Sequence, residues 1–137
     1  MSPRIKTKKQ ASKKQDLEVN QEAVKILRNV SNSEAFHFYE NVGKPTGESA
    51  KSLLEFLNVV NTIKLESLQF HLERKDFQAW FKETLKDYEL AERIESISPA
   101  NKEKLRTKIH EIVERRLQEL RDTFITIEVK EELAIER

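Results

Sequence analysis

The apolar residues of the central and C-terminal parts of the chain recur with the period of an α-helix. Ser52 and Glu55 have the spacing of a capping box, in which the two side chains satisfy the first free backbone N–H groups of a helix. The helix predicted from this start presents four apolar residues on one face: Leu53, Phe56, Leu57 and Val60. A second apolar group, predicted as a short helix, consists of Leu65, Leu68, Phe70 and Leu72.

Three further helices are predicted downstream. Asp76 is placed to cap one whose apolar residues fall at i, i+3, i+4 and i+8: Phe77, Trp80, Phe81 and Leu85. Asp87 can cap the next, which contains Leu90, Ile94 and Ile97. Ser98 and Pro99 predict the start of the longest helix, 99–122. Its apolar stripe has steps of three or four residues: Leu105, Ile109, Val113, Leu117, Leu120 and Phe124.

The two ends of this region have weaker patterns. Asn20 can cap a short helix with one apolar face formed by Val24, Leu27 and Val30. Residues 35–40 alternate as in a strand, and residues 41–49 contain both glycines and form a turn-rich loop. The segment 124–129 is compatible with a strand that pairs with 35–40 or with a helix.

Together these segments predict an all-α protein, a compact bundle of about five helices with at most one short two-stranded pairing. The length of 137 residues suits a single folded domain. We predict a basic N-terminal arm over residues 1–18, a helical domain over residues 19–123 and a C-terminal extension over residues 124–137.

The composition restricts the kinds of site that are available. The absence of cysteine excludes disulfides and thiolate metal sites. No apolar run approaches the roughly 18 residues of a membrane span, and the N-terminus lacks a hydrophobic signal core, so we expect a cytoplasmic protein without a membrane partner. Few glycines and many Glu, Lys and Arg residues are also typical of thermophile proteins.

The charge of the chain is strongly asymmetric. Residues 1–15 contain six basic residues and no acidic one, whereas residues 16–137 contain 19 basic and 24 acidic residues. The arm has too few apolar residues to fold alone and is predicted to be disordered. Flexible cations of this kind bind phosphates and release counterions, so the candidate nucleic-acid-binding residues are Arg4, Lys6, Lys8, Lys9, Lys13 and Lys14. A solubility tail is the alternative.

Candidate catalytic and metal-binding residues are concentrated in "ESLQFHLERKDFQAW", residues 66–80. His71 with Glu73 or Asp76 suggests a metal or acid–base pair, but zinc needs three or four converging ligands. We favour a structural turn, in which Asp76 caps the following helix, and we predict no catalytic residue, metal or cofactor.

Two other features have structural and functional interpretations. Trp80 with its neighbouring phenylalanines could stack bases, but an aromatic stripe at helical spacing favours the core. The loop that contains Gly43 and Gly47 lacks the lysine that a phosphate-binding Walker loop requires after its second glycine.

Two stretches resemble a known family: "FHFYENVGKPTGESAKSLLEFL" and "LESLQFHLERKDFQAWFKETLKDYELAERIESI". Over about Phe36–Leu120 the chain resembles the domain-of-unknown-function family 5752, small, mostly archaeal, uncharacterised helical proteins. The resemblance implies a fold but no activity, and members often have Gly where this chain has Lys75. The arm and the segment after Leu120 lie outside the resemblance.

The functional hypothesis is a non-catalytic nucleic-acid-associated protein, an RNA- or ribosome-bound accessory factor held by its arm, with DNA as another possible ligand and protein neighbours expected. The alternative is a protein–protein adaptor or homodimeric regulator that acts through the long helix 99–122, whose stripe nearly fits heptads. No motif of an enzyme is present.

Overall fold

The computed structural model describes residues 21–135, with side chains described as far as Phe124. Residues 21–27 are helical and come first. The elements that follow are the 3₁₀ helix η1 (Asn32–Glu34), β1 (Phe36–Asn41), β2 (Lys44–Ala50), α2 (Leu53–Val60), α3 (Leu65–Arg74), α4 (Asp76–Ala79), the π-helix η2 (Trp80–Leu85), α5 (Tyr88–Glu95) and α6 (Lys102–Ile135).

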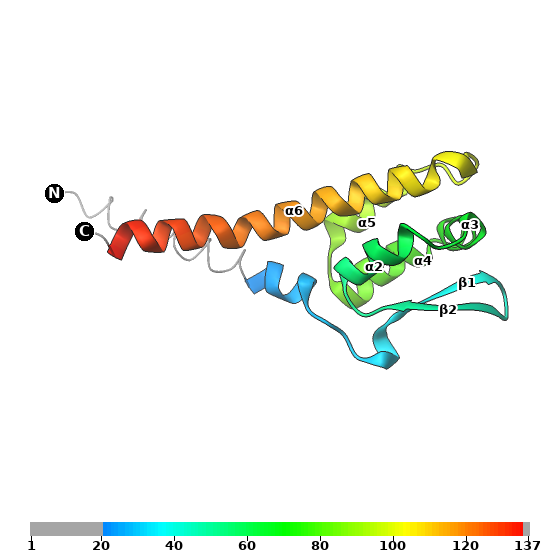
Figure 1. The fold of residues 1–137 in the computed structure, drawn as a ribbon, viewed down its shortest axis with the longest axis horizontal. Coiled ribbons are helices and arrows are strands. Elements are labelled where there is room, and N and C mark those ends of the chain that lie inside the picture. Colours follow the sequence, from blue (N-terminus) through cyan, green and yellow to red (C-terminus); the bar gives the residue numbers. More distant parts are fainter. Residues whose placement is uncertain (1–20, 136–137) are drawn as a thin grey trace.

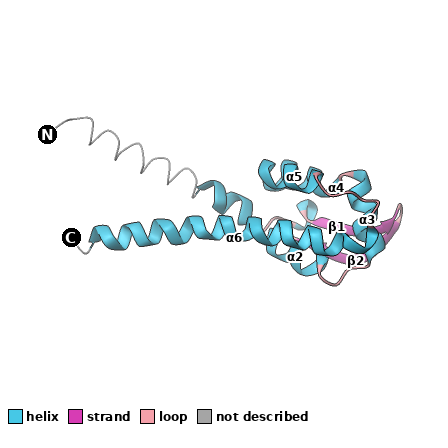
Figure 2. Ribbon diagram, turned by 90° about the horizontal axis from the view of Figure 1, so that it is seen from above, coloured by secondary structure: helices cyan, strands magenta, loops and turns pink. Residues whose placement is uncertain are grey.

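Helices α2 and α3 lie between the β-hairpin on one side and α6 on the other (Figure 1). Strand β1 packs on α3 and β2 on α2, while α6 contacts α2, α3 and α5. The C-terminal half of α6 extends beyond this body (Figure 2). The prediction of a mainly helical domain is therefore confirmed, and a two-stranded antiparallel sheet accompanies the helices.

The structure decides between the strand and the helix that the sequence left open for residues 124–129. β1 pairs with β2, not with residues 124–129, which are helical. The expected loop after residue 41 is mostly strand, with Gly43 in the turn at φ 70° and Gly47 within β2 at φ 88°. The sequence concealed β2 because this strand is exposed, irregular in register and without apolar alternation. β1 does alternate as predicted, with Phe36 and Phe38 buried.

The start of α2 confirms the capping prediction. The Ser52 side-chain oxygen accepts a hydrogen bond from the Glu55 backbone N–H at 3.1 Å. The Glu55 carboxylate in return accepts from the Lys51 N–H at 3.0 Å, one residue earlier than in a standard capping box. The four apolar residues predicted on its inner face are all buried.

The helix at 21–27 buries a different face from the predicted one. Ala23 and Ile26 are buried, whereas Val24 is 52% exposed. Of the predicted residues, Val30 is buried just after the helix and Leu27 is partly buried against the core. The prediction was wrong for Val24, because it chose the face that contains Val24 over the face that contains Ala23 and Ile26. The proposed cap, Asn20, lies outside the described residues.

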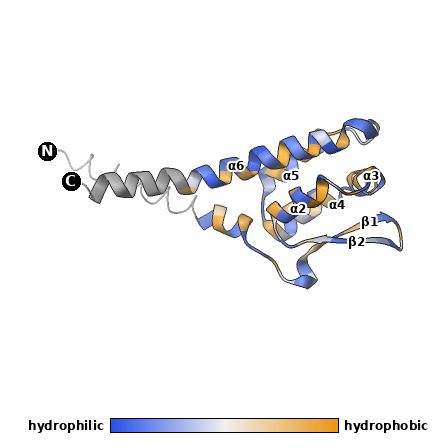
Figure 3. Cartoon of the chain, viewed as in Figure 1, coloured by the Kyte–Doolittle hydropathy of each residue, from blue (hydrophilic) through white to orange (hydrophobic). Residues whose placement is uncertain are grey.

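Helix α6 starts later and ends later than predicted. Its first residue is Lys102, and Ser98 instead accepts a hydrogen bond from the Ala100 N–H in the preceding turn, so the predicted start at Ser98 and Pro99 is wrong. The predicted stripe from Leu105 to Leu120 is buried, and Phe124 is partly buried against it. Figure 3 shows hydrophobic and hydrophilic residues alternating along the part of α6 that is coloured by hydropathy.

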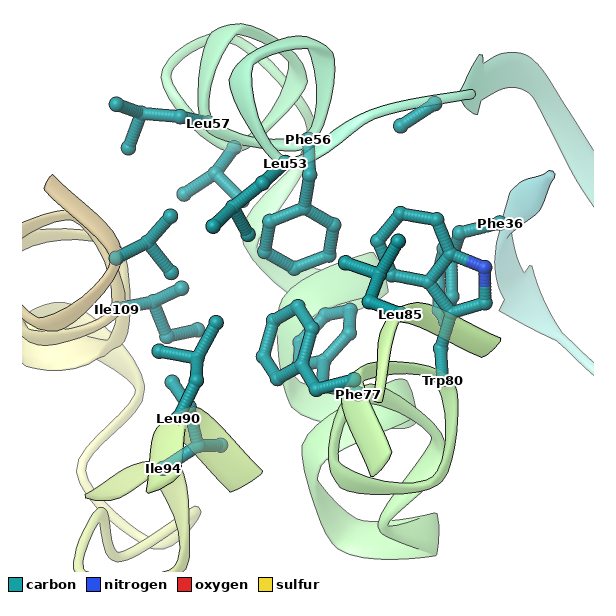
Figure 4. Close-up of a cluster of buried hydrophobic side chains, with 14 of the residues drawn as sticks. Phe36, Leu53, Phe56, Leu57, Phe77, Trp80, Leu85, Leu90, Ile94 and Ile109 are labelled. Carbon is teal, nitrogen blue, oxygen red and sulfur yellow. The ribbon is translucent and has the colours of Figure 1, made fainter. Parts of the chain in front are cut away.

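A cluster of aromatic rings occupies the centre of the core. Phe56 of α2 and Phe77 of α4 meet edge to face at 5.1 Å between ring centroids (Figure 4). Trp80 packs on Phe36 at 5.7 Å, and its indole N–H donates to the Glu34 carbonyl oxygen at 2.8 Å. Trp80 is 7% exposed, so its assignment to the core is confirmed.

Replacing Trp80 with Ala should lower the free energy of unfolding by about 3–5 kcal/mol, because a large buried side chain is lost and a cavity remains. Urea denaturation followed by circular dichroism would measure the change. Val42→Ala is the matched control, since Val42 is 78% exposed at the hairpin tip and should matter little. Equal effects of the two substitutions would contradict the core assignment.

Candidate functional site

His71 of α3 is a buried histidine whose two ring nitrogens are both occupied. Its Nε2 accepts a hydrogen bond from the Tyr39 backbone N–H of β1 at 2.8 Å. Nε2 therefore carries no proton, and Nδ1–H donates to the Asp76 carboxylate of α4, also at 2.8 Å. The imidazole is thus held as one neutral tautomer between three elements.

The surroundings of His71 oppose its protonation. Its ring packs against the rings of Phe36 and Phe77 at centroid distances of 4.8 and 5.5 Å. This burial lowers the pKa of His71 below its ordinary value of 6.5, although the nearby Asp76 carboxylate acts in the opposite direction. A histidine with both nitrogens engaged would have to break one of these hydrogen bonds before it exchanged a proton with a substrate. The stretch does contain a turn between α3 and α4, as predicted.

The turn itself differs in detail from the prediction. Lys75, not Asp76, occupies the cap position, and it adopts a left-handed conformation with φ 63°. Asp76 is the first residue of α4, and its carboxylate pairs with His71 and, at 3.3 Å, with Arg74. The predicted capping role of Asp76 is therefore wrong, because its carboxylate instead pairs with the preceding residues His71 and Arg74. Glu73 is exposed and does not join this pair.

A groove of about 420 Å³ lies over this region, between β1 and helices α3 and α4. The Arg74 guanidinium stacks over Phe70 along it, 4.9 Å from the ring centroid. His37 and Glu83 also line the groove. No hydrogen bond or ion pair joins His37 to Glu83 among the described residues. His71 and Asp76 line the same groove and are the histidine–carboxylate pair found there.

The remaining imidazole on the helices is also engaged. His110 of α6 contacts Asn61 at 2.7 Å and Glu114 at 2.8 Å. Within residues 21–124, no group of three or more His, Asp or Glu side chains comes together to hold a metal ion. None of the helices in this part of the chain combines the length and the hydropathy needed to cross a bilayer.

Many charged side chains of the body form ion pairs, and most of these pairs join residues that belong to, or cap, two different helices or strands. Arg93 of α5 donates two hydrogen bonds to Glu119 of α6, at 2.6 and 2.9 Å, and this lowers the pKa of Glu119. Buried Asp87 caps α5 and also pairs with Arg116 at 2.9 Å. Residues 21–124 contain 17 basic and 18 acidic residues, so the described body is nearly neutral.

The structure leaves the sequence-predicted nucleic-acid-binding residues untested. These six residues, all at the N-terminal end of the chain, lie outside the described residues: Arg4, Lys6, Lys8, Lys9, Lys13 and Lys14. The structure brings together His71 and Asp76 from the candidate set. It adds the Tyr39 backbone as their partner, which no sequence signal identified because the contact spans 32 residues.

The described residues form a mainly helical body with a β-hairpin. A family model described as "Family of unknown function (DUF5752)" matches residues 73–132, a little under half of the chain. This match confirms the resemblance noted in the sequence. No curated protein and no solved structure matches the chain.

The matched span differs from the expected one. It begins at Glu73 and so omits the hairpin, α2 and most of α3. It ends at Glu132, inside α6, so the expectation that the segment after Leu120 lies outside the resemblance is wrong. The family pattern therefore includes the part of α6 that extends beyond the body.

The pKa of His71 predicts a dependence of stability on pH. Because this pKa is lower in the folded chain, the unfolded chain binds the proton more readily below pH 6.5. The stabilisation is complete above pH 6.5 and is lost as the pH falls through the lowered value. We expect the free energy of unfolding to fall from about pH 7 to about pH 5, and His71→Gln to flatten that part of the profile. Urea denaturation at several pH values would measure this; equal slopes would contradict it.

The role of Asp76 predicts a difference between two substitutions. Asp76→Ala leaves the buried His71 Nδ1–H without its acceptor and should cost about 1–3 kcal/mol of stability. Asp76→Asn retains an acceptor oxygen and should cost less. Thermal unfolding of both variants would separate them, and equal losses would show that the contact with His71 does not matter.

Proposed function

We propose that this protein is a non-catalytic nucleic-acid-associated protein, an RNA- or ribosome-bound accessory factor held by its basic arm. The observation that carries the proposal is the concentration of six basic residues, without any acidic residue, in residues 1–15. Each such cation can neutralise a phosphate and release a counterion, which gives affinity that depends on salt and little on sequence. A cytoplasmic location is part of this proposal.

The nearly balanced charge of the body supports a role for the arm as the main site of attraction. Residues 21–124 have a net charge of −1, and many of their cations already pair with carboxylates. A polyanion therefore gains little by approaching the body as a whole. The excess of acidic over basic residues in 16–137 lies mainly in two short segments, residues 16–20 and 125–137.

The organisation of the body also supports a binding role over a catalytic one. Two of its three histidines are tied to neighbouring groups, and its buried Asp87 serves as a helix cap and an ion-pair partner. A scaffold of this kind presents surfaces to other molecules. We therefore propose no enzyme activity and no cofactor.

The alternative function, an adaptor or homodimeric regulator that acts through helix 99–122, meets an obstacle. The stripe that suggested it, from Leu105 to Leu120, is buried in the domain's own core. A partner would have to contact the opposite, charged face of α6 or its C-terminal part. We therefore keep it as the second hypothesis.

Deleting residues 1–15 should remove most of the affinity for RNA or ribosomes and leave the body folded. The slope of log K against the logarithm of the salt concentration should become shallower for each phosphate contact that is lost. The change should be about 0.7 per contact for single strands and about 0.9 for duplex DNA. Co-sedimentation with ribosomes, with and without nuclease and at two salt concentrations, would measure the loss.

A matched pair of variants separates charge from general effects of the arm. Changing Lys8, Lys9, Lys13 and Lys14 to Gln should weaken binding strongly, whereas Arg at the same positions should be tolerated, since simple phosphate contacts depend mainly on charge. Unchanged co-sedimentation of the truncated protein would make the arm a solubility tail and favour the adaptor hypothesis.

A further inference from the structure

The helix at 21–27 and helix α6 point to the same end of the molecule. The two helices lie side by side and run antiparallel, as both views show (Figures 1 and 2). Ala23 and Ile26 of the short helix belong to the same buried core as Leu117 and Leu120 of α6. Residue 21, where the described chain begins, therefore faces the end at which α6 leaves the body.

The part of α6 beyond Phe124 is a poor helix former. Residues 125–135 rise roughly 16 Å past the body (Figure 1). Four of the five residues 125–129 are β-branched, which lowers helix propensity. Most helical stability in proteins comes from the packing of an apolar face on another element. We therefore expect this part of α6 to have a packing partner.

The apolar stripes of both helices continue beyond the described core. The stripe of α6 reaches Phe124, and the next step of three residues leads to Ile127. On the other helix, the step from Ile26 back to Ala23 is followed by a step of four to Val19. Steps of three and four residues keep side chains on one helix face. The two faces that share the core thus each continue by one apolar residue.

The charges of the two chain segments are complementary. Residues 125–137 contain four acidic and two basic residues, whereas residues 1–15 contain six basic residues and no acidic one. The stripe position of α6 that follows Ile127 is Glu131, and Glu128 lies beside it by helical spacing. A carboxylate in this position suits an ammonium group better than another apolar face, because opposite charges attract.

We propose that residues 8–20 of this chain pack along residues 124–135 of its own α6. Val19 covers Ile127, and the lysines of residues 8–14 lie along the carboxylates of residues 128–132. As a helix, residues 8–20 would span roughly 20 Å, and an extended chain would span more, so the segment is long enough to cover the extension.

This contact makes α6 a competitor of nucleic acid for the arm, an inference that rests on the proposed function. Each lysine of the arm can face a carboxylate of α6 or a phosphate, but not both. Phosphates carry condensed counterions that are released on binding, so a nucleic acid displaces the carboxylates. The extension of α6 thus lowers the affinity of the arm and weakens the binding of ligands with few phosphates.

The same charges disfavour the other occupants of this helix face. The α6 extension of a second copy has the same net negative charge and would be repelled. A nucleic acid would meet the same carboxylates. The arm of a second copy has the right charge, but a tethered segment acts at an effective concentration that reaches the millimolar range. The chain's own arm is therefore the favoured occupant.

Nuclear magnetic resonance of the full chain with a nitroxide label tests the contact. The sequence has no cysteine, so Ser12→Cys supplies the only attachment site. At low salt the label should broaden the amide signals of residues 125–135. Salt at about 1 M should reduce the effect, because the Debye length falls to about 3 Å. A label at Val42→Cys, at the exposed hairpin tip, should leave these signals sharp.

A mixed sample separates the chain's own arm from that of a second copy. Nitroxide-labelled chain without isotopes is mixed with isotope-labelled chain without nitroxide, and the observed signals should stay sharp. Broadening in the mixed sample would assign the contact to a second copy and overturn the proposal. Sharp signals of residues 125–135 in the chain labelled through Ser12→Cys at low salt would also overturn it.

Removal of the carboxylates should release the arm for nucleic acid. Changing Glu128, Glu131 and Glu132 to Gln should tighten the binding of a single-stranded RNA oligonucleotide at least about threefold, because several weak ion pairs are lost together. The matched control changes three exposed carboxylates of the body to Gln: Glu48, Glu73 and Glu92. Both variants change the net charge equally, so equal affinities would overturn the competition.

These measurements distinguish the inference from the proposed function. If the full chain and its variants bind no RNA, the proposed function fails, and broadening of residues 125–135 still establishes the contact. If RNA binds but these signals are sharp in the free chain, the contact fails and the proposed function stands. Added RNA should remove the broadening, and broadening that persists with RNA bound would overturn the competition.

Discussion

The buried imidazole of His71 is the contact on which the arrangement of the hairpin and the helices depends. It accepts from the backbone of β1 and donates to the first residue of α4, so one side chain of α3 fixes three elements. Both hydrogen bonds require the neutral ring with its proton on Nδ1. Packing against aromatic rings keeps it neutral, because a charge there would lose its hydration. The same hydrogen bonds occupy both ring nitrogens of His71.

The second constraint is the anchoring of α6 by three arginines. Arg106 donates to the Val60 and Ile63 carbonyl oxygens at 2.6 Å each and so satisfies groups at the end of α2. Arg93 and Arg116 form ion pairs between α5 and α6, with Glu119 and with buried Asp87. Together with the buried stripe, these contacts commit the inward face of α6 to its own domain. The part beyond Phe124 continues as helix away from the body (Figure 1).

These constraints direct the search for function to the surface and the arm. Among the described residues, the buried side-chain polar atoms without a hydrogen-bond partner are Ser67 Oγ and Gln78 Oε1.

The sequence by itself determined the helices, since their signals are local. The capping pair at Ser52 and Glu55, the cap at Asp87 and the stripe from Leu105 to Leu120 all involve residues within a few turns of one helix. It also favoured a structural turn over a site around His71, because too few ligand types are nearby. The tertiary structure alone decided which face of the helix at 21–27 is buried and which group contacts His71 Nε2. The Tyr39–His71 hydrogen bond joins groups 32 residues apart and leaves no periodic trace in the chain. The β1–β2 pairing and the His71–Asp76 contact are local, but the exposed, irregular β2 and the capping role expected of Asp76 hid them in the sequence.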